Sequence, residues 1–194
     1  LLPLYSSVVT ELGVGDSSSL EMQNRQSALT GGIGAYSSVK GSGSDVQSIK
    51  AVLVFSGKSL SRNHKELTDL LKETLLGVRF DELERLKELV AQMRARREQS
   101  VTSNGHALAM GVASSKMSPA AYLSYQLAGV QGIKAIKSLD DSLSDDATLA
   151  KFASQLAEIH RRVSQSERQY LVVAEAEVTE EVAQHIEACH SDFK

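Results

Sequence analysis

The sequence contains one cysteine, Cys189, among its 194 residues. A single thiol excludes an internal disulfide, so the chain suits a reducing compartment, either the bacterial cytoplasm or an organelle matrix. Long apolar runs are also missing, because no stretch approaches the roughly 18 to 20 uninterrupted apolar residues of a membrane span. The N-terminus lacks the basic-then-apolar order of a signal peptide. We therefore expect no membrane partner.

A strong charge of either sign is absent. Lys and Arg number 21 against 24 Asp and Glu, which gives a formal net charge of −3. Such a balance argues against a chain whose task is to neutralise nucleic-acid phosphates or to dock on anionic lipid. Hydrophobic residues make up 42% and charged residues 23%, as in an ordinary globular protein with a sizeable core. We predict one domain over residues 1–194 and no nucleic-acid partner.

An initiator methionine is missing as well. The chain opens at Leu1-Leu2-Pro3-Leu4, within a stretch whose apolar spacing predicts a helix. We interpret the chain as a fragment of a longer protein.

Apolar residues at helical spacing, together with cap residues and glycine breaks, predict a mostly helical chain. The predicted helices cover approximately residues 4–12, 18–29, 61–76, 81–99, 106–117, 118–127, two shorter stretches flanking 138–146, 146–163 and 179–189. Alternating or β-branched residues predict three strands, over 33–39, 46–55 and 168–174. The first two are expected to pair in antiparallel fashion across a Gly/Ser-rich loop.

The strand predicted over 46–55 is apolar on both faces. Ile49, Leu53 and Phe55 share one face, and Val52 and Val54 lie on the other. A strand with two apolar faces is typical of the centre of a sheet. The helix over 61–76 is expected to cover this sheet. The element order therefore predicts an α+β fold with an antiparallel-rich sheet covered by helices.

A phosphate-binding loop is incomplete in this sequence. Phe55-Ser56-Gly57-Lys58-Ser59 has the ending of such a loop and stands between a predicted strand and a predicted helix. The first glycine of the motif is missing, because Val52 occupies its place inside the strand. Without that loop the backbone amides cannot wrap a phosphate, so a strand end turning into a helix is the favoured interpretation.

Zinc-binding helix motifs are absent too, since neither His-Glu-x-x-His nor its reverse occurs. His64 has Thr68 as its fourth neighbour, which is a poor ligand. His185 and Cys189 are four residues apart on one helix face, with His190 adjacent, but no third and fourth ligand is apparent. We expect these residues to mark a helix end rather than a metal site.

Nucleophilic chemistry also lacks its usual pattern. His190 would point about 100° away from Cys189 on a helix, so it is badly placed as a base. No Gly-x-Ser-x-Gly elbow occurs, and His106 is expected to begin a helix. Arg94, Arg96 and Arg97 are expected to complement the negative end of the helix over 81–99 rather than to bind an anion. The residues alone predict no catalytic site.

Several motifs, in order, nevertheless resemble one family. They are Leu2-Pro3-Leu4, Thr10-Glu11-Leu12-Gly13, Thr30-Gly31-Gly32-Ile33, Ser56-Gly57-Lys58-Ser59-Leu60 with Arg62-Asn63, Arg85-Leu86-Lys87-Glu88-Leu89-Val90, Ser103-Asn104-Gly105-His106-Ala107-Leu108-Ala109 and Ser118-Pro119-Ala120-Ala121. The likeness, over residues 1–174, is to the pitrilysin/insulinase-type zinc metallopeptidases, in their presequence-protease or falcilysin-like branch. No single motif is diagnostic, but their order and spacing together are.

The resemblance implies a large enzyme of four homologous α+β domains, whose two halves close around unfolded peptides and whose zinc lies in the first domain. This chain resembles the third domain, and we expect it to lack the first strand of that domain's sheet. An exposed sheet edge would favour a homodimer of the isolated fragment.

Placed without gaps, the family's His-x-x-Glu-His residues fall at Ser6, Val9 and Thr10, none of which can replace its counterpart. A further glutamate of the family's site falls near Glu88, for which a helix surface charge is the favoured interpretation. The family's assisting arginine and tyrosine belong to the fourth domain, so they are not carried onto Arg168 or Tyr170.

We therefore expect no catalytic, cofactor-binding or metal-binding residue in this segment, and zinc only in the catalytic domain of the parent protein. The expected partners are the other domains of the same polypeptide and the parent's unfolded peptide substrates. The alternative is a scaffold domain of a wholly non-catalytic peptidase homologue, and a nucleotide-binding module through Gly57-Lys58-Ser59 is a third interpretation.

Overall fold

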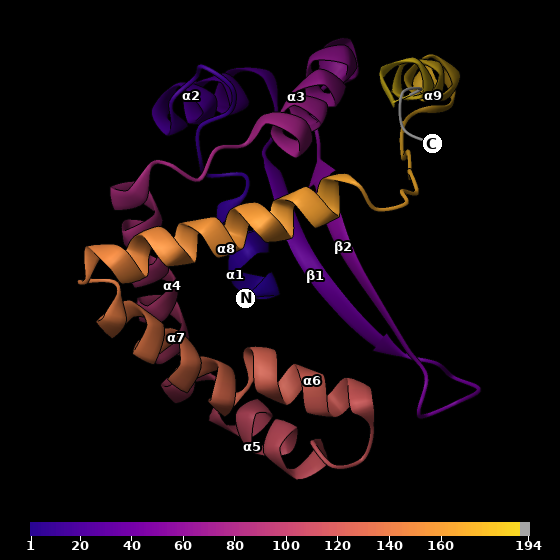
Figure 1. Ribbon diagram of the computed structural model, residues 1–194. Helices are drawn as coiled ribbons and strands as arrows, with labels where there is room; N and C mark the ends of the chain where they lie inside the picture. Colours follow the sequence, from indigo (N-terminus) through magenta and orange to yellow (C-terminus); the bar gives the residue numbers. More distant parts are fainter. Residues whose placement is uncertain (191–194) are drawn as a thin grey trace. The chain divides into compact units, whose positions relative to one another are not determined.

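The structure is a computed structural model that describes residues 1–190, and the side chains of residues 1–189 (Figure 1). Two helices precede a pair of consecutive strands, and helical elements make up the rest of the described chain. In chain order the elements are α1 (Leu2–Val8), α2 (Ser19–Leu29), β1 (Ile33–Gly41), β2 (Ile49–Gly57), the 3-10 turn η1 (Ser61–Asn63), α3 (His64–Gly77), α4 (Leu83–Ser103), α5 (Gly105–Ser114), α6 (Pro119–Ala128), α7 (Val130–Ser142), α8 (Asp146–Ser164) and α9 (Ala176–His190).

The predicted α+β class is confirmed, with two antiparallel strands and a helical remainder. The prediction that the second strand lies at the centre of the sheet is wrong. In the described part of the chain β2 pairs with β1 alone, and Ile49 and Val52 are 39% and 40% exposed. Although both faces of β2 are apolar, most of its residues are exposed to solvent.

The strand predicted over 168–174 is also wrong. Residues 167–175 take no regular secondary structure, and Leu171 and Val173 are 88% and 90% exposed. High β-propensity reflects how well a side chain packs on a pleated sheet, so it cannot form a strand where no ladder partner is present. The helical stretches predicted to flank 138–146 correspond to α7, which extends into this range as far as Ser142, and to the start of α8.

The chain divides into two compact units. The first, here the α4–α7 unit, comprises residues 1–4, 36–54 and 83–154, and the second, the α3–α9 unit, comprises 5–35, 55–82 and the described residues from 155 onward. Four apolar residues at helical spacing are buried in α4: Leu86, Leu89, Val90 and Met93. In the α3–α9 unit, the fully buried side chains include Tyr5, Leu12, Met22, Leu70 and Leu156. No helix among the described residues combines the length and apolarity needed to cross a membrane.

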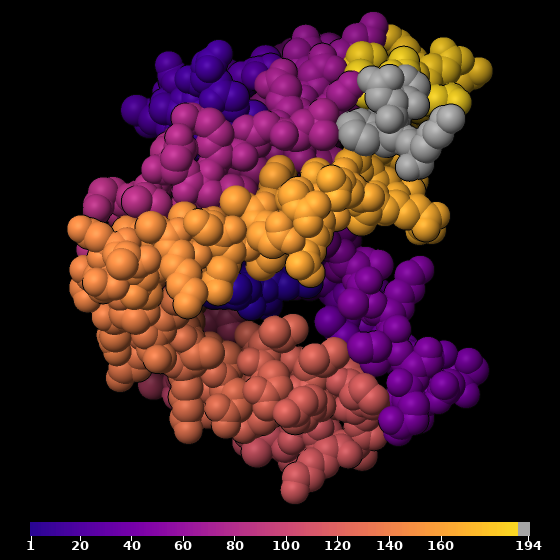
Figure 2. Space-filling view, in the orientation of Figure 1, coloured from indigo at the N-terminus to yellow at the C-terminus, as the bar shows by residue number. Residues whose placement is uncertain are grey.

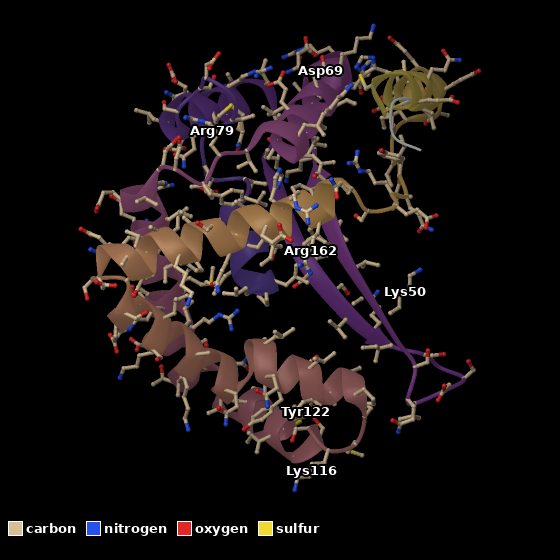
Figure 3. All side chains as sticks on the ribbon, in the orientation of Figure 1. Lys50, Asp69, Arg79, Lys116, Tyr122 and Arg162 are labelled. Carbon is tan, nitrogen blue, oxygen red and sulfur yellow. The ribbon has the colours of Figure 1, made fainter. Side chains whose placement is uncertain are left out.

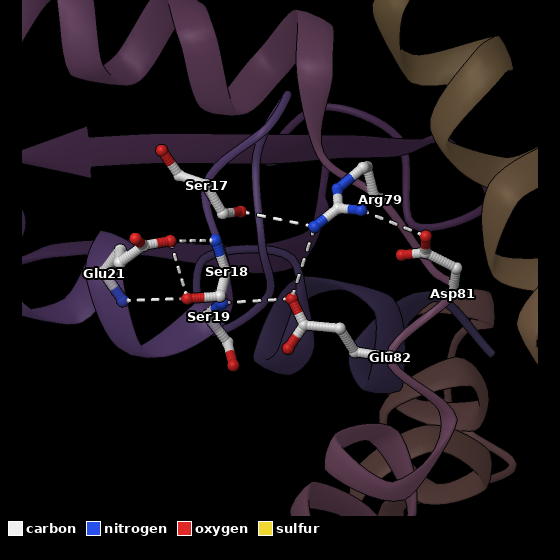
Figure 4. Close-up of polar contacts among 7 residues, drawn as sticks. All are labelled: Ser17, Ser18, Ser19, Glu21, Arg79, Asp81 and Glu82. Carbon is white, nitrogen blue, oxygen red and sulfur yellow. Dashed lines mark hydrogen bonds and ion pairs between the residues drawn. The ribbon is translucent and has the colours of Figure 1, made fainter.

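Residues 13–21 and 77–82 form a polar junction in the α3–α9 unit (Figure 4). Ser18 caps α2 as predicted and forms a capping box, since the Ser18 amide donates to Glu21 Oε2 at 2.7 Å and the Glu21 amide donates to Ser18 Oγ at 3.4 Å. The Ser19 amide donates to Glu82 Oε1 at 3.0 Å. Arg79 donates to the Ser17 carbonyl at 3.4 Å and pairs with Asp81 at 3.1 Å. The start of α2 is thus tied to the segment that follows α3.

Candidate functional site

The positions at which an ungapped placement puts the family's zinc-binding residues carry side chains that are poor zinc ligands. Ser6, Val9 and Thr10 are 4%, 0% and 5% exposed, and they offer two hydroxyls and an aliphatic side chain. Glu88 lies on α4 and pairs with Arg85 at 3.3 Å, which supports the interpretation as a surface charge. The residues present at these places do not fit the family's catalytic metal, and no hydrolytic step runs through them.

The incomplete phosphate loop is the end of a strand. The Lys58 amide donates to the Gly32 carbonyl at 3.3 Å, and the Gly31 amide donates to the Lys58 carbonyl at 2.7 Å. A Cβ on Gly57 would lie 2.5 Å from Leu67 Cδ1, so this side chain of α3 closes over the glycine. The Lys58 amide already donates to a backbone carbonyl, and Leu67 already covers Gly57, so neither is open to a phosphate. These contacts support the prediction of a strand end rather than a nucleotide site.

Arg94, Arg96 and Arg97 do not end a helix, because α4 continues to Ser103. The expected interaction with a helix terminus is therefore wrong. Arg94 donates to Asp140 at 2.8 Å and to Asp141 at 2.6 Å, both on α7, and to Glu98 at 3.1 Å. Arg97 donates to the Leu127 carbonyl at 3.0 Å. These contacts join α4 to the helices packed against it within the α4–α7 unit, and Arg94 is saturated with carboxylates rather than available to an anion.

A buried polar pair lies inside the α3–α9 unit. The Tyr5 hydroxyl and His160 Nδ1 are 2.9 Å apart, with Tyr5 fully buried and His160 8% exposed. The Phe80 ring lies beside both, with centroids 6.3 Å from Tyr5 and 5.7 Å from His160. Burial raises the pKa of Tyr5 and lowers the pKa of His160. Both groups are therefore neutral at pH 7 and belong to the core, not to a reactive site.

The lowered pKa of His160 predicts a pH-dependent stability. In the unfolded chain His160 takes up a proton near its ordinary pKa of 6.5, whereas burial in the folded chain disfavours protonation. Because the unfolded state then binds more protons than the folded state, the free energy of unfolding rises with pH in this range. The contribution is complete above about pH 6.5 and is lost as the pH falls through the lowered folded pKa. Urea midpoints measured between pH 7.5 and 5 should fall more steeply for the parent chain than for His160→Asn. Equal slopes would contradict the prediction.

Three ligand-type side chains meet between α3 and α9. Cys189 Sγ lies 3.3 Å from His185 Nε2 and 3.4 Å from Asp69 Oδ1, and His185 Nε2 lies 3.5 Å from Asp69 Oδ1. All three belong to the α3–α9 unit, and Asp69 is labelled on α3 in Figure 3. In the described part of the chain, this is the one group of three His, Cys, Asp or Glu residues close enough to share an ion.

Sequence spacing identified only part of this cluster. The four-residue separation of His185 and Cys189 places both on one face of α9, as expected. Asp69 is 120 residues from Cys189, and no local pattern marks it. His190 ends α9, but its side chain lies outside the described residues. The expectation of too few ligands rested on one helix alone, and α3 supplies the third.

His64 stands next to the cluster. Its ring meets the His185 ring edge-on at a centroid distance of 6.0 Å. Its Nδ1 lies 2.7 Å from the Ser61 carbonyl, so Nδ1 carries the proton and Nε2 presents a lone pair. That Nε2 is buried without a hydrogen-bond partner, and Glu181 Oε1 lies 3.7 Å away. His106, by contrast, is exposed at the start of α5, as expected.

Cys189 is not an activated nucleophile. Burial raises the pKa of its thiol, and the Asp69 carboxylate raises it further, so the thiol is protonated at pH 7 in the metal-free chain. The thiolate, not the thiol, attacks electrophiles. The cluster is thus better suited to binding than to covalent chemistry.

The chain is similar to a known group of proteins over most of its length. Residues 1–139 match the family of domains described as associated with peptidases of metallopeptidase family 16, subfamily C. The mitochondrial presequence protease of Candida albicans is 29% identical over 200 residues, which cover 99% of this chain and 19% of that protein. Presequence protease 1 of Arabidopsis thaliana, chloroplastic/mitochondrial, is 28% identical over 83% of this chain and 15% of that protein. The mitochondrial presequence protease of Xenopus laevis is 26% identical over 78% and 15%. The chain therefore spans less than a fifth of the length of these relatives.

Proposed function

This chain belongs to the family of domains associated with subfamily C of metallopeptidase family 16, and we propose that it is a non-catalytic domain of a longer, zinc-dependent endopeptidase that degrades peptides. In this proposal the chain forms part of the wall around the enclosed peptide and packs against the catalytic half. The relatives named presequence proteases support this assignment, because each is at least five times longer than the matched segment. Of the two compartments that the sequence allows, we propose the organelle matrix, as in those relatives.

The absence of hydrolytic chemistry follows from particular side chains. A metallopeptidase needs ligands that hold zinc and a carboxylate that takes a proton from the zinc-bound water. Ser6, Val9 and Thr10 supply neither, and Glu88 is engaged with Arg85. The parent's zinc would therefore be held by residues outside this chain.

The observation that carries the packing role is an exposed apolar segment. The side chains of Leu171 and Val173 are 88% and 90% exposed, in an irregular segment with strong β-propensity. Exposed apolar side chains that cluster in this way mark interaction surfaces. The α4–α7 unit adds a second such surface, because α5 and α6 carry no Asp, Glu, Lys or Arg and have no fully buried residue. Atoms of these two helices form the salmon-coloured surface in Figure 2. Met110, Met117 and Tyr122 are exposed there, and Tyr122 is labelled in Figure 3.

The proposal predicts that the chain alone cleaves no peptide. Cleavage of an unstructured, fluorescently quenched peptide should be measured with zinc present for this chain, for the parent's zinc-bearing half, and for the two mixed or joined. We expect turnover only where both parts are present. Chelator-sensitive cleavage by this chain alone would overturn the proposal, and an inactive intact parent would favour the scaffold alternative.

Two matched variants test the packing role in the same assay. Leu171→Asp places a charge on the exposed apolar segment, and Leu20→Asp does so at a leucine that is 67% exposed on α2. Both should leave the circular dichroism of the chain unchanged, because surface substitutions change stability little. Only Leu171→Asp should weaken association with the zinc-bearing half. Equal association of both variants would contradict the role assigned to this segment.

A further inference from the structure

We propose that Asp69, His185 and Cys189 form a Zn²⁺ site that joins α9 to α3 and takes no part in peptide hydrolysis. This goes beyond the proposed function, and it departs from the expectation, based on sequence alone, that the segment holds no metal. The site lies wholly within the α3–α9 unit.

The spacing of the three donor atoms fits the ion. Zinc in proteins is bound tetrahedrally by thiolate, imidazole and carboxylate donors, with bonds of roughly 2.0 to 2.3 Å, so neighbouring donors stand about 3.3 to 3.6 Å apart. The three separations here are 3.3, 3.4 and 3.5 Å. One ion can therefore reach all three atoms with little movement of the backbone.

The donor set also fits zinc better than it fits harder cations. Calcium and magnesium select oxygen ligands, whereas a site with one sulfur, one nitrogen and one oxygen suits zinc. A thiolate and a carboxylate together would offset the charge of the ion. Lys72 is a positive charge near the Cys189 thiol, and it opposes binding of the cation.

An independent observation beside the cluster also points to a ligand. His64 gives its Nδ1 proton to a backbone carbonyl, which is the arrangement that orients metal-binding histidines, and its Nε2 is buried and lacks a hydrogen bond. The His64 ring lies edge-on to His185, 6.0 Å away between centroids. We therefore assign His64 to the fourth position of the site, where the ion would compete with Glu181, whose Oε1 lies 3.7 Å from His64 Nε2.

An ion bound by Asp69, His185 and Cys189 would strengthen the attachment of α9 to α3. No side chain of α9 is buried among residues 176–189, although the helix packs against α3. The irregular segment 167–175 connects α8 to α9. Such connecting segments are in general more mobile than helices. An ion bound to both helices would stabilise this contact because the ligands come together only in the folded chain.

The test measures zinc binding by the whole 194-residue chain. Equilibrium dialysis with Zn²⁺ should find one tightly held ion per chain, and Co²⁺ in its place should show a thiolate-to-metal charge-transfer band. Cys189→Ser and Asp69→Asn should each lower the affinity for zinc at least about 100-fold. Loss of a residue that only orients a metal ligand already lowers metal affinity roughly 10- to 100-fold. His106→Gln, which removes an exposed histidine of α5, should leave binding unchanged.

Each remaining outcome would overturn the site. No retained zinc, retention without the charge-transfer band, or equal binding by Cys189→Ser and the parent chain would do so. Circular dichroism of the metal-free variants separates lost ligands from lost folding, and zinc should raise the melting temperature of the parent chain but not of Cys189→Ser. The result is distinct from the peptidase test, because a chain that binds zinc and cleaves nothing satisfies both proposals.

Discussion

Replacement of Tyr5 by alanine should lower the free energy of unfolding by about 3 to 5 kcal/mol. The Tyr5 side chain is fully buried, and its ring contacts Phe80 and His160 at centroid distances of 6.3 and 6.1 Å. Truncation removes this aromatic packing and leaves a cavity that the surrounding helices close only in part. Urea unfolding followed by circular dichroism measures the loss.

Tyr5→Phe is the matched control for the hydroxyl. It keeps the ring but removes the 2.9 Å contact with His160 Nδ1, at a cost of about 1 to 3 kcal/mol for a buried polar group left without its partner. The alanine variant should therefore be clearly the less stable of the two. Equal losses for Tyr5→Phe and Tyr5→Ala would show that ring packing contributes little.

The second large effect is expected at Gly13. A Cβ there would lie 2.3 Å from Glu82 Oε1, 2.6 Å from the Ser17 carbonyl and 2.9 Å from Arg79 Nη2. Glu82 and Arg79 could move only by giving up contacts to Ser19 and Ser17, and the Ser17 carbonyl is backbone. Gly13→Ala should therefore cost about 2 to 3 kcal/mol, at the upper end of the usual range for overpacked sites.

Gly111→Ala is the control for the same chemical change. A Cβ at Gly111, inside α5, meets no atom within 4 Å. Alanine is the better helix former, so this substitution should stabilise the chain by up to about 1 kcal/mol. Thermal unfolding of both variants should shift in opposite directions, and a Gly13→Ala variant as stable as the parent chain would refute the close approach.

Local signals in the sequence predicted most helices and their starts. Ser18 and Ser118 cap α2 and α6 because a side-chain oxygen can accept an amide proton of the first turn, which depends only on neighbouring residues. The strand prediction over 168–174 was wrong because a strand, unlike a helix cap, depends on residues far away in the sequence. The residues of this segment favour a strand, but a strand needs a partner, and local sequence carries no information about whether one is present.

The candidate site divides in the same way. His185 and Cys189 are recognisable as neighbours from helix periodicity alone. Asp69 joins them only because α3 and α9 pack together, and nothing in its own surroundings distinguishes it from other aspartates. The role of Arg94 was likewise misjudged, because its partners Asp140 and Asp141 lie on another helix.

The helix pair α5 and α6, neither of which carries a charged residue, has a consequence for how the chain reaches its final form. Neither helix has a fully buried side chain, so each gains less of the burial that offsets the conformational entropy lost on folding. Such helices open locally at a low free energy, well below that of the whole chain. A partner surface that binds α5 and α6 only in their folded form would shift the local opening equilibrium towards that form. Folding of these two helices and assembly with the partner would then be coupled.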